Sequence, residues 1–165
     1  SIREWFAGPV ALSGAIGSGH AILGAQAMGA DLGYAGSIFI ATQEAAAAQG
    51  YKDMIVASTG EDIVYTNLFT GVHGNYLAPS VIAAGLDPND LPKSDPSAMN
   101  FGSGGNQKSK AWRDIWGCGQ GIGAVKDIPT VAELVGRLSD EYEQAKAELA
   151  QKTSFTAGRA LLAAE

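Results

Sequence analysis

PVALSGAIGSGHAILGAQAMGADLGYAGSIFIAT, the stretch at residues 9–42, decides the fold class. The apolar run at residues 9–12 is short and flanked by glycines, as expected for a strand buried on both faces. A glycine-rich turn follows at residues 13–19, and residues 20–28 then have the composition of a helix. A second apolar run occupies residues 32–36. Strand, helix and strand at this spacing predict an α/β fold with parallel strands and a right-handed crossover.

Capping signals set the expected ends of two helices. Ser18 is a suitable N-cap for the first helix, and Gly29 fits the position after its end. Thr42 is the expected N-cap of a second, alanine-rich helix that has Glu44 in its first turn and runs towards Ser58. The sequence therefore predicts two successive strand–helix units.

The chain divides into three expected parts. Residues 1–58 hold the two strand–helix units, and residues 59–127 are predicted to form an irregular cap or insertion on the substrate side. Within that segment, residues 62–69 are rich in β-forming residues, whereas residues 102–107 have the composition of a loop. A short helix is predicted around residues 108–116.

The third part, residues 128–165, is predicted to form a long amphipathic helix and a tail. Thr130, followed three residues later by Glu133, has the pattern of a capping box. Glu133 and Arg137 are spaced four apart and are expected to pair on the exposed side. The residues expected to form the apolar stripe of this helix are Leu134, Leu138, Tyr142, Ala145 and Leu149.

Composition excludes several classes of protein. Hydrophobic residues make up 46% of the 165 residues and charged residues 17%, which is typical of a folded domain. The 11 basic residues are scattered among 17 acidic ones, so no nucleic-acid partner is expected. The single cysteine, Cys118, argues against disulfides and thiolate metal sites and favours a cytoplasmic location. Glycines break the uncharged stretch before Asp31, so no membrane span is expected either.

The turn at residues 13–19 has the chemistry of an anion site. Glycines between a strand and a helix point backbone N–H groups outward, and the helix dipole adds partial positive charge. The alternative is a plain turn that needs glycine for its geometry. In a dinucleotide-binding fold, an acidic residue that binds the ribose follows the second strand. Here Asp31 precedes that strand, so the turn is not a dinucleotide fingerprint. No Lys-Ser or Lys-Thr pair follows, which excludes the nucleotide P-loop.

The end of the second predicted strand repeats this pattern. Gly36 and Ser37 stand directly before the next helical segment. Two successive strand ends of this kind fit the phosphate site that many β/α barrels build after strands seven and eight. The pair of turns therefore favours a ligand that carries a phosphate.

These motifs resemble the nitronate monooxygenase family, formerly called 2-nitropropane dioxygenases. The family motifs GGI-x-x-G and G-T-R-F have counterparts in residues 14–19 and 36–39. Residues 62–77 and 111–135 are also similar to the carboxy-terminal part of the family. The latter segment contains a version of the motif A-G-Q-x-x-G at residues 118–123. The resemblance extends over the chain to about residue 150.

The resemblance implies the carboxy-terminal portion of an FMN-binding (β/α)8 TIM barrel, extended by the irregular cap and the long terminal helix. The sequence departs from the family motifs at three positions, with Ala15 for glycine, Ser37 for threonine and Ile38 for arginine. The last change removes a cation from the pocket. The residues that the resemblance implies for FMN binding are Ser13, Gly14, Ala15, Gly36, Ser37 and Gln120.

The implied reaction is the oxidative denitrification of nitronates or nitroalkanes by molecular oxygen, with His73 and Gly119 on the substrate side. The catalytic histidine of the family would lie upstream of Ser1, so no catalytic residue is assigned in this chain. One alternative is an NAD(P)H-dependent flavin reductase acting on quinones or enoyl thioesters, and another is a non-catalytic half-barrel. Because buried parallel strands need neighbours, a missing barrel half or a homo-oligomeric partner is expected.

Two further side chains have competing interpretations. His20 is either a contact to the predicted phosphate or a solvent-facing helix residue. Cys118 is a weak candidate nucleophile without an evident base, and a small buried side chain is the alternative. No metal site is expected.

Overall fold

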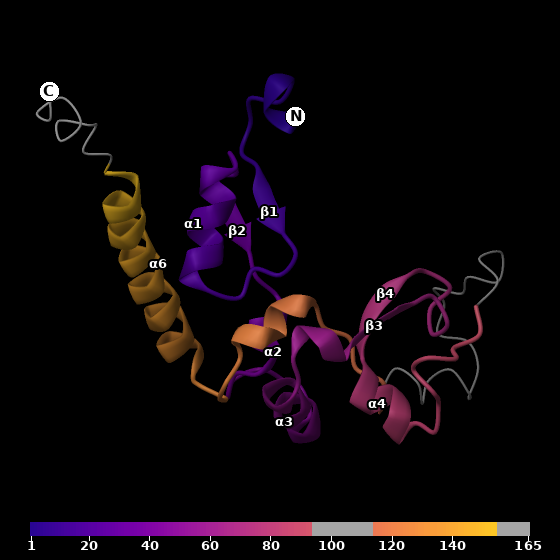
Figure 1. Cartoon of the computed structure of the whole chain (residues 1–165). Helices are drawn as coiled ribbons and strands as arrows, with labels where there is room; N and C mark the ends of the chain where they lie inside the picture. Colours follow the sequence, from indigo (N-terminus) through magenta and orange to yellow (C-terminus); the bar gives the residue numbers. More distant parts are fainter. Residues whose placement is uncertain (94–113, 155–165) are drawn as a thin grey trace, which may run out of the picture.

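A computed structural model of the chain describes residues 1–93 and 114–154 (Figure 1). It confirms the α/β class and the parallel pairing of the first two strands, in which Ala11 lies opposite Leu32. Helix α1 connects these strands and packs against the long helix α6. The elements in chain order are η1 (Ile2–Glu4), β1 (Ala11–Ser13), α1 (Gly19–Ala27), β2 (Leu32–Tyr34), α2 (Ser37–Ile40), α3 (Gln49–Ala57), η2 (Gly60–Asp62), β3 (Ile63–Thr66), β4 (Gly74–Leu77), α4 (Ala78–Ala83), η4 (Gln120–Ala124) and α6 (Val131–Thr153).

The predicted caps of the first helix are confirmed. The Ser18 side chain accepts a hydrogen bond from the backbone N–H of Ala21 at 3.2 Å, as an N-cap does. Gly29 follows the end of α1 with φ of +100°, a conformation that favours glycine.

The prediction of a second continuous helix from Thr42 is wrong. The chain forms the short α2, turns, and only then begins α3 at Gln49. The Thr42 hydroxyl donates to the carbonyl of Phe39 at 2.8 Å instead of capping a helix. The Glu44 carboxylate accepts from the backbone N–H of Val131 at 2.9 Å and so stabilises the start of α6. The two residues expected to start one helix therefore end α2 and cap α6.

The segment predicted to be irregular contains regular structure. Strands β3 and β4 form an antiparallel hairpin in which Tyr65 lies opposite Asn75. Thr66 and Tyr76 are buried on one face of this hairpin, and Leu77 is buried on the other face, whereas Tyr65 on that second face is 69% exposed. The predicted loop at residues 102–107 lies outside the described residues, as does most of the predicted helix around residues 108–116.

The long terminal helix has its predicted start. In α6, the Thr130 hydroxyl accepts from the Glu133 backbone N–H, and the Glu133 carboxylate accepts from the Thr130 backbone N–H. The charges of Glu133 and Arg137 attract each other as expected, but Arg137 forms its two hydrogen bonds of 2.8 Å with Asp127, and the Glu133 carboxylate bonds to the helix cap. Of the predicted apolar stripe, Leu134, Leu138 and Ala145 are buried, and Leu149 is 43% exposed.

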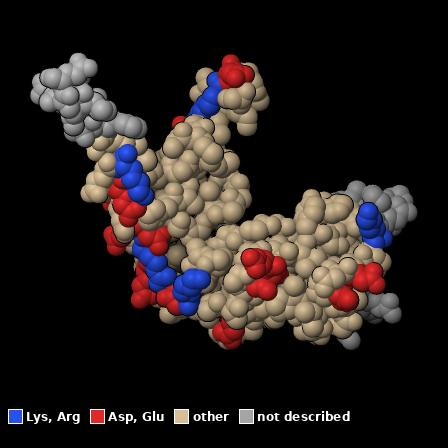
Figure 2. Space-filling view, viewed as in Figure 1, with Lys and Arg blue, Asp and Glu red and all other residues tan. Residues whose placement is uncertain are grey.

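The main core joins α2, α3, η4 and the first half of α6. Ile55 and Ile122 are fully buried at its centre. Figure 2 shows charged side chains gathered along α6 and more widely scattered over the rest of this face. The buried members of this core are Ile38, Ala41, Ile55, Leu77, Cys118, Ile122, Val125, Leu134 and Leu138.

The parallel sheet has an uncovered apolar face. Leu32 and Tyr34 alternate with Gly33, which packs against α1, and their side chains are 60% and 66% exposed. Within residues 1–93 and 114–154, no third strand pairs with β1 or β2. Parallel strands are almost always covered on both faces. The exposed side of β1 and β2 is therefore an unsatisfied packing surface.

The start of β1 depends on an ionised carboxylate. Asp31 accepts a hydrogen bond from the Val10 backbone N–H at 2.7 Å and another from the Arg3 guanidinium. The Val10 amide, followed by Arg3, holds the pKa of the Asp31 carboxyl below its ordinary value. A lowered folded-state pKa adds stability above the unfolded pKa, and that stability is lost as the pH falls through the folded pKa.

We therefore expect the free energy of unfolding to fall below about pH 4. The Asp31→Asn variant is expected to be less stable at neutral pH and to have a flatter acid dependence. Urea unfolding followed by circular dichroism at a series of pH values would measure both. Equal acid slopes for parent and variant would contradict the assignment.

Candidate functional site

Three segments distant in sequence meet at one place. The Gly119 backbone N–H donates to the Ser37 hydroxyl oxygen at 2.8 Å, which joins the start of α2 to the turn before η4. A Cβ added at Gly121 would lie 3.2 Å from the Ala15 carbonyl carbon, so the turn at residues 13–19 contacts the same segment. The structure thus brings together five of the predicted residues: Ala15, Ser37, Gly119, Gln120 and the adjoining Gly36.

The two strand ends present backbone donors to open space. Gly14 and Ala15 have consecutive positive φ values of 100° and 54°, which turn the chain sharply after Ser13 at the end of β1. An added Cβ at Gly14 or Gly36 would meet no atom within 4 Å. Among the described residues, no hydrogen bond uses the backbone N–H of Ala15, Gly36 or Ser37. Such unpaired donors on adjacent turns can bind an anion.

Glycine is required where the first turn touches η4. A Cβ added at Gly17 would lie 2.5 Å from the Gly121 carbonyl oxygen and 3.2 Å from the Ala124 side chain. A side chain at this position would push the two segments apart. The glycine pattern of residues 14–19 therefore serves two purposes, the turn itself and this close packing.

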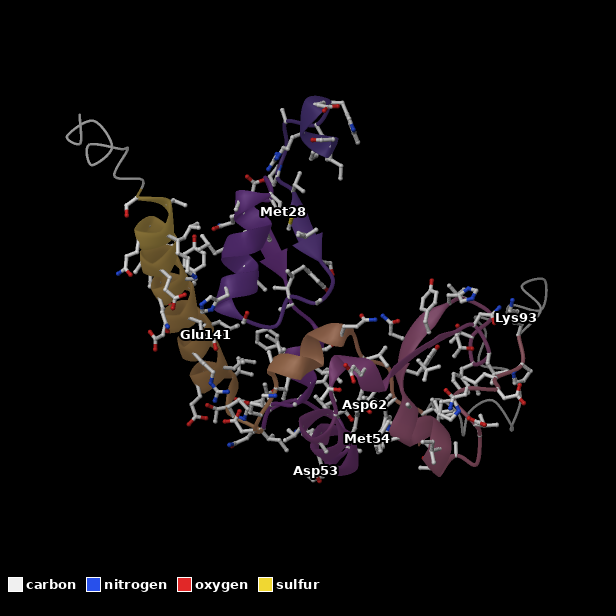
Figure 3. All side chains as sticks on the ribbon, viewed as in Figure 1. Met28, Asp53, Met54, Asp62, Lys93 and Glu141 are labelled. Atoms are coloured by element: carbon white, nitrogen blue, oxygen red, sulfur yellow. The ribbon has the colours of Figure 1, made fainter. Side chains whose placement is uncertain are left out.

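The start of α1 does not have the predicted role. The Gly19 backbone N–H donates to the Glu141 carboxylate at 2.8 Å, and Figure 3 shows Glu141 on α6 beside α1. A carboxylate at a helix N-terminus is stabilised by the dipole and screens it. The expectation that the α1 dipole would serve a phosphate is therefore wrong for this N–H group. An anion bound near Gly14 depends mainly on backbone donors.

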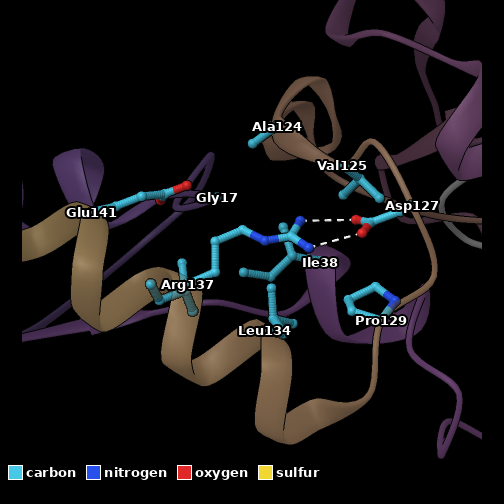
Figure 4. Close-up of a pocket in the computed structure, with 10 residues that line it drawn as sticks. Gly17, Ile38, Ala124, Val125, Asp127, Pro129, Leu134, Arg137 and Glu141 are labelled. Atoms are coloured by element: carbon cyan, nitrogen blue, oxygen red, sulfur yellow. Dashed lines mark hydrogen bonds and ion pairs between the residues drawn. The ribbon is translucent and has the colours of Figure 1, made fainter.

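A small pocket behind the first turn is lined in part by an ion pair. Gly17 and Ile38 line it together with Arg137, which forms a bidentate pair with Asp127, another lining residue (Figure 4). The Arg137 hydrogen bonds hold the pKa of the Asp127 carboxyl below its ordinary value. The family motif has an arginine at the position of Ile38. Arg137 does not replace that cation, because its guanidinium is already paired with Asp127.

Gln120 stands at the edge of the same site. Its carbonyl oxygen Oε1 accepts a hydrogen bond from Asn75 Nδ2 at 3.4 Å. A Cβ added at Gly60 would lie 3.3 Å from the backbone carbonyl oxygen of Gln120, so η2 packs against the other side of this turn. Sequence reasoning missed Asn75, although its position opposite Tyr65 follows from the hairpin register. The β-forming residues 63–66 and the glycines at 71 and 74 were the signals that could have indicated this hairpin.

The histidines are separated from each other. His73 stacks on Tyr65 with ring centroids 4.9 Å apart, on the exposed face of the hairpin. His20 lies on α1 with its Nε2 3.8 Å from a carboxylate oxygen of Glu148, and its side chain is half exposed. His20 therefore faces α6, which supports the interpretation of a surface residue. His73 stays a prediction for the substrate side.

Cys118 is unsuited to nucleophilic chemistry. It is buried in the main core, and burial raises the pKa of its thiol to about 12. The thiolate, which is the reactive form, is therefore scarce at neutral pH. This result supports the interpretation of a small packing side chain.

The described residues, 1–93 and 114–154, contain neither a metal-binding cluster nor a membrane-spanning helix. No cluster of three or more His, Cys, Asp or Glu side chains in this part of the chain could hold a metal ion. No helix among these residues combines the length and apolar character needed to cross a bilayer.

Comparison with known proteins identifies relatives for most of the chain. It is 30% identical over 149 residues to a nitronate monooxygenase of Paraburkholderia phytofirmans, which covers 87% of this chain and 40% of the relative. No protein-family model matches the chain. The chain thus spans less than half the length of this relative.

Solved structures have the same fold over a similar extent. Nitroalkane oxidase from Streptomyces ansochromogenes matches with a TM-score of 0.68 and 25% identity, over 90% of this chain and 43% of its own. The M276A mutant of FabK from Thermotoga maritima matches with a TM-score of 0.66 and 19% identity, over 92% of this chain and 47% of its own. The FabK likeness concerns the fold alone.

Proposed function

We propose that this chain, which is related to the carboxy-terminal half of the nitronate monooxygenase family, supplies the phosphate-binding side of an FMN site in a barrel enzyme that oxidises nitronates. One observation carries the proposal. The turns after β1 and β2 lie side by side, and the backbone N–H groups of Ala15, Gly36 and Ser37 donate to no group within residues 1–93 and 114–154. Adjacent strand ends of this kind are where β/α barrels bind phosphate.

The chemistry of the donors fits a phosphate group. Ser37 Oγ accepts from Gly119, so the hydroxyl hydrogen remains available for donation to an anion. Backbone N–H groups and a hydroxyl form shorter and stronger hydrogen bonds with a charged oxygen than with a neutral one. The open space beside Gly14 and Gly36 lets such an anion approach the backbone closely.

The chain would bind and orient the flavin, whose ring supplies the redox chemistry. Gln120 would lie near the flavin edge, and its amide both donates and accepts hydrogen bonds. Gly119 and His73 would lie on the substrate side. Nitronates are proposed as substrates over quinones or enoyl thioesters because a relative of 30% identity and a solved structure of 25% identity are named for nitronate and nitroalkane chemistry.

The remainder of the barrel would cover the exposed side of β1 and β2. Leu32 and Tyr34 need a packing partner, and the relatives are more than twice as long as the matching segment. We propose that this partner is the other barrel half, supplied by preceding residues or by a separate chain. The residues that hold the catalytic base would belong to that half.

Gly36→Asp tests the phosphate site in the complete flavoprotein. The φ of Gly36 is −122°, so the backbone accepts a side chain, and the added carboxylate would stand in the open space proposed for phosphate. We expect FMN to bind about 10- to 100-fold more weakly, because lost charge-assisted hydrogen bonds are worth ~1.5–3 kcal/mol. Riboflavin, which has no phosphate, is expected to bind almost as it does to the parent. Flavin fluorescence titration measures both affinities.

Gly24→Asp is the matched control for this experiment. Gly24 lies on α1, and an added Cβ would also meet no atom within 4 Å. This variant carries the same added charge away from the strand ends and is expected to retain the affinity for FMN. Unchanged FMN affinity in Gly36→Asp, or equal losses for FMN and riboflavin, would contradict the phosphate assignment.

A further inference from the structure

The hairpin β3–β4 presents two different faces. Thr66 and Tyr76 lie on the buried face, and Tyr76 packs edge-on against Phe69 at 4.8 Å. Tyr65 and Asn75 are direct cross-strand partners, so their side chains share the opposite face. Tyr65 is 69% exposed on this face. Ile63 and Leu77 continue this face into the main core, so its open part is the end that carries Tyr65 and Asn75, and the Asn75 side chain contacts Gln120 there.

The hydrogen bond between the two amides fixes the direction of one of them. Asn75 Nδ2 donates to Gln120 Oε1 at 3.4 Å, so the acceptor end of the Gln120 amide is turned towards the hairpin. The NH2 group of Gln120 has two donors, and no hydrogen bond among the described residues uses either of them. Gln120 is exposed, so these donors can reach a ligand.

The Gln120 backbone is also held from two sides. The Gly119 backbone N–H donates a hydrogen bond to the Ser37 hydroxyl, and Gly60 packs closely against the backbone carbonyl of Gln120. The side-chain torsions are thus the main remaining freedom of Gln120. A partner for Oε1 removes much of that freedom and keeps the donors directed to one side.

We infer that Asn75 is a positioning residue that orients Gln120, so that the Gln120 NH2 group donates to an oxygen of a planar anionic ligand on the open face of the hairpin. The inference rests on the proposed function, because it supplies a substrate contact for that site. A nitronate has two acceptor oxygens in one plane, which suits an NH2 group as partner. Nitrate has the same planar arrangement of oxygens without reactivity.

A double-mutant cycle with nitrate tests whether Asn75 acts through Gln120. The variants Asn75→Leu, Gln120→Leu and their combination are prepared in the complete flavoprotein, and nitrate binding is followed by the change in flavin absorbance. Leucine is similar in size to the amides and adds no charge. We expect Gln120→Leu to weaken nitrate binding about 10- to 100-fold and Asn75→Leu about 3- to 10-fold. In the Gln120→Leu background, Asn75→Leu is expected to have no further effect.

Asn89→Leu is the control. Asn89 is an exposed asparagine outside this site, and its Nδ2 donates a hydrogen bond of 3.3 Å to the Asp87 carboxylate. It is expected to leave nitrate affinity unchanged. Additive losses in the double variant would overturn the positioning role of Asn75, and so would an unchanged affinity in Asn75→Leu. A parent that binds no FMN would overturn the proposed function and this inference together. A parent that binds FMN but whose Gln120→Leu variant keeps full nitrate affinity would overturn the inference alone.

Discussion

Replacing Gly19 by alanine is expected to destabilise the protein by about 3 kcal/mol, at the upper end of overpacking effects. An added Cβ would collide with the backbone of α6 at Leu138 and Tyr142, and it would lie 2.7 Å from the carbonyl carbon of Glu141. Backbone atoms cannot rotate away as a flexible side chain can. The collision is relieved only if α1 and α6 move apart, and this movement also lengthens the hydrogen bond from Gly19 to Glu141.

Gly24→Ala on the same helix provides the matched comparison. An added Cβ at Gly24 would meet no atom within 4 Å, so only the intrinsic helix propensity changes. We expect this variant to be more stable than the parent by ~0.8–1 kcal/mol. Urea unfolding of the three proteins measures the difference, which should exceed about 3 kcal/mol between the two variants. Similar stabilities would show that α1 and α6 do not pack as closely as the structure indicates.

The isolated chain of 165 residues is expected to oxidise nitronates at least ~10³-fold more slowly than the complete enzyme, even when loaded with FMN. The proposed phosphate contacts alone do not orient the substrate, and a missing general base alone costs ~10²–10⁴-fold. Steady-state oxygen consumption with a nitronate substrate measures the two rates. A rate within about tenfold of the complete enzyme would contradict the need for the other barrel half.

Adding the other half should restore turnover through the exposed face of β1 and β2. Leu32→Asp places a charge on that face and is expected to prevent restoration, because burying an unpaired carboxylate is costly. Val135→Asp is the control, since Val135 is 51% exposed on α6 and away from the sheet. Restoration by the Leu32→Asp chain would show that the partner packs elsewhere.

Local signals in the sequence predicted the helix ends that depend on neighbouring residues. Ser18 caps α1 through Ala21, three residues away, and Thr130 and Glu133 cap α6 across the same spacing. The parallel pairing of β1 and β2 was likewise predicted from the alternation of strand, helix and strand. In each case the interacting groups lie within one supersecondary unit.

Interactions across the fold could not be predicted in the same way. Glu44 caps α6 from 87 residues away, and Glu141 bonds to Gly19 from 122 residues away. A carboxylate in a turn, such as Glu44, or in a helix, such as Glu141, gives no sign of which distant N–H group it will accept from. The meeting of Ala15, Ser37 and Gln120 was predicted through the family resemblance, because spacing alone does not bring residue 120 to the strand ends.

The burial of Cys118 gives the chain a built-in reporter. It is the single cysteine of the sequence, its thiol is protonated and enclosed, and it directly precedes the Gly119 and Gln120 turn. An alkylating reagent can reach this sulfur only when the core around η4 opens, so the labelling rate measures the free energy of that local opening. A molecule that binds at the neighbouring turn would slow labelling without any need for a spectroscopic signal of its own.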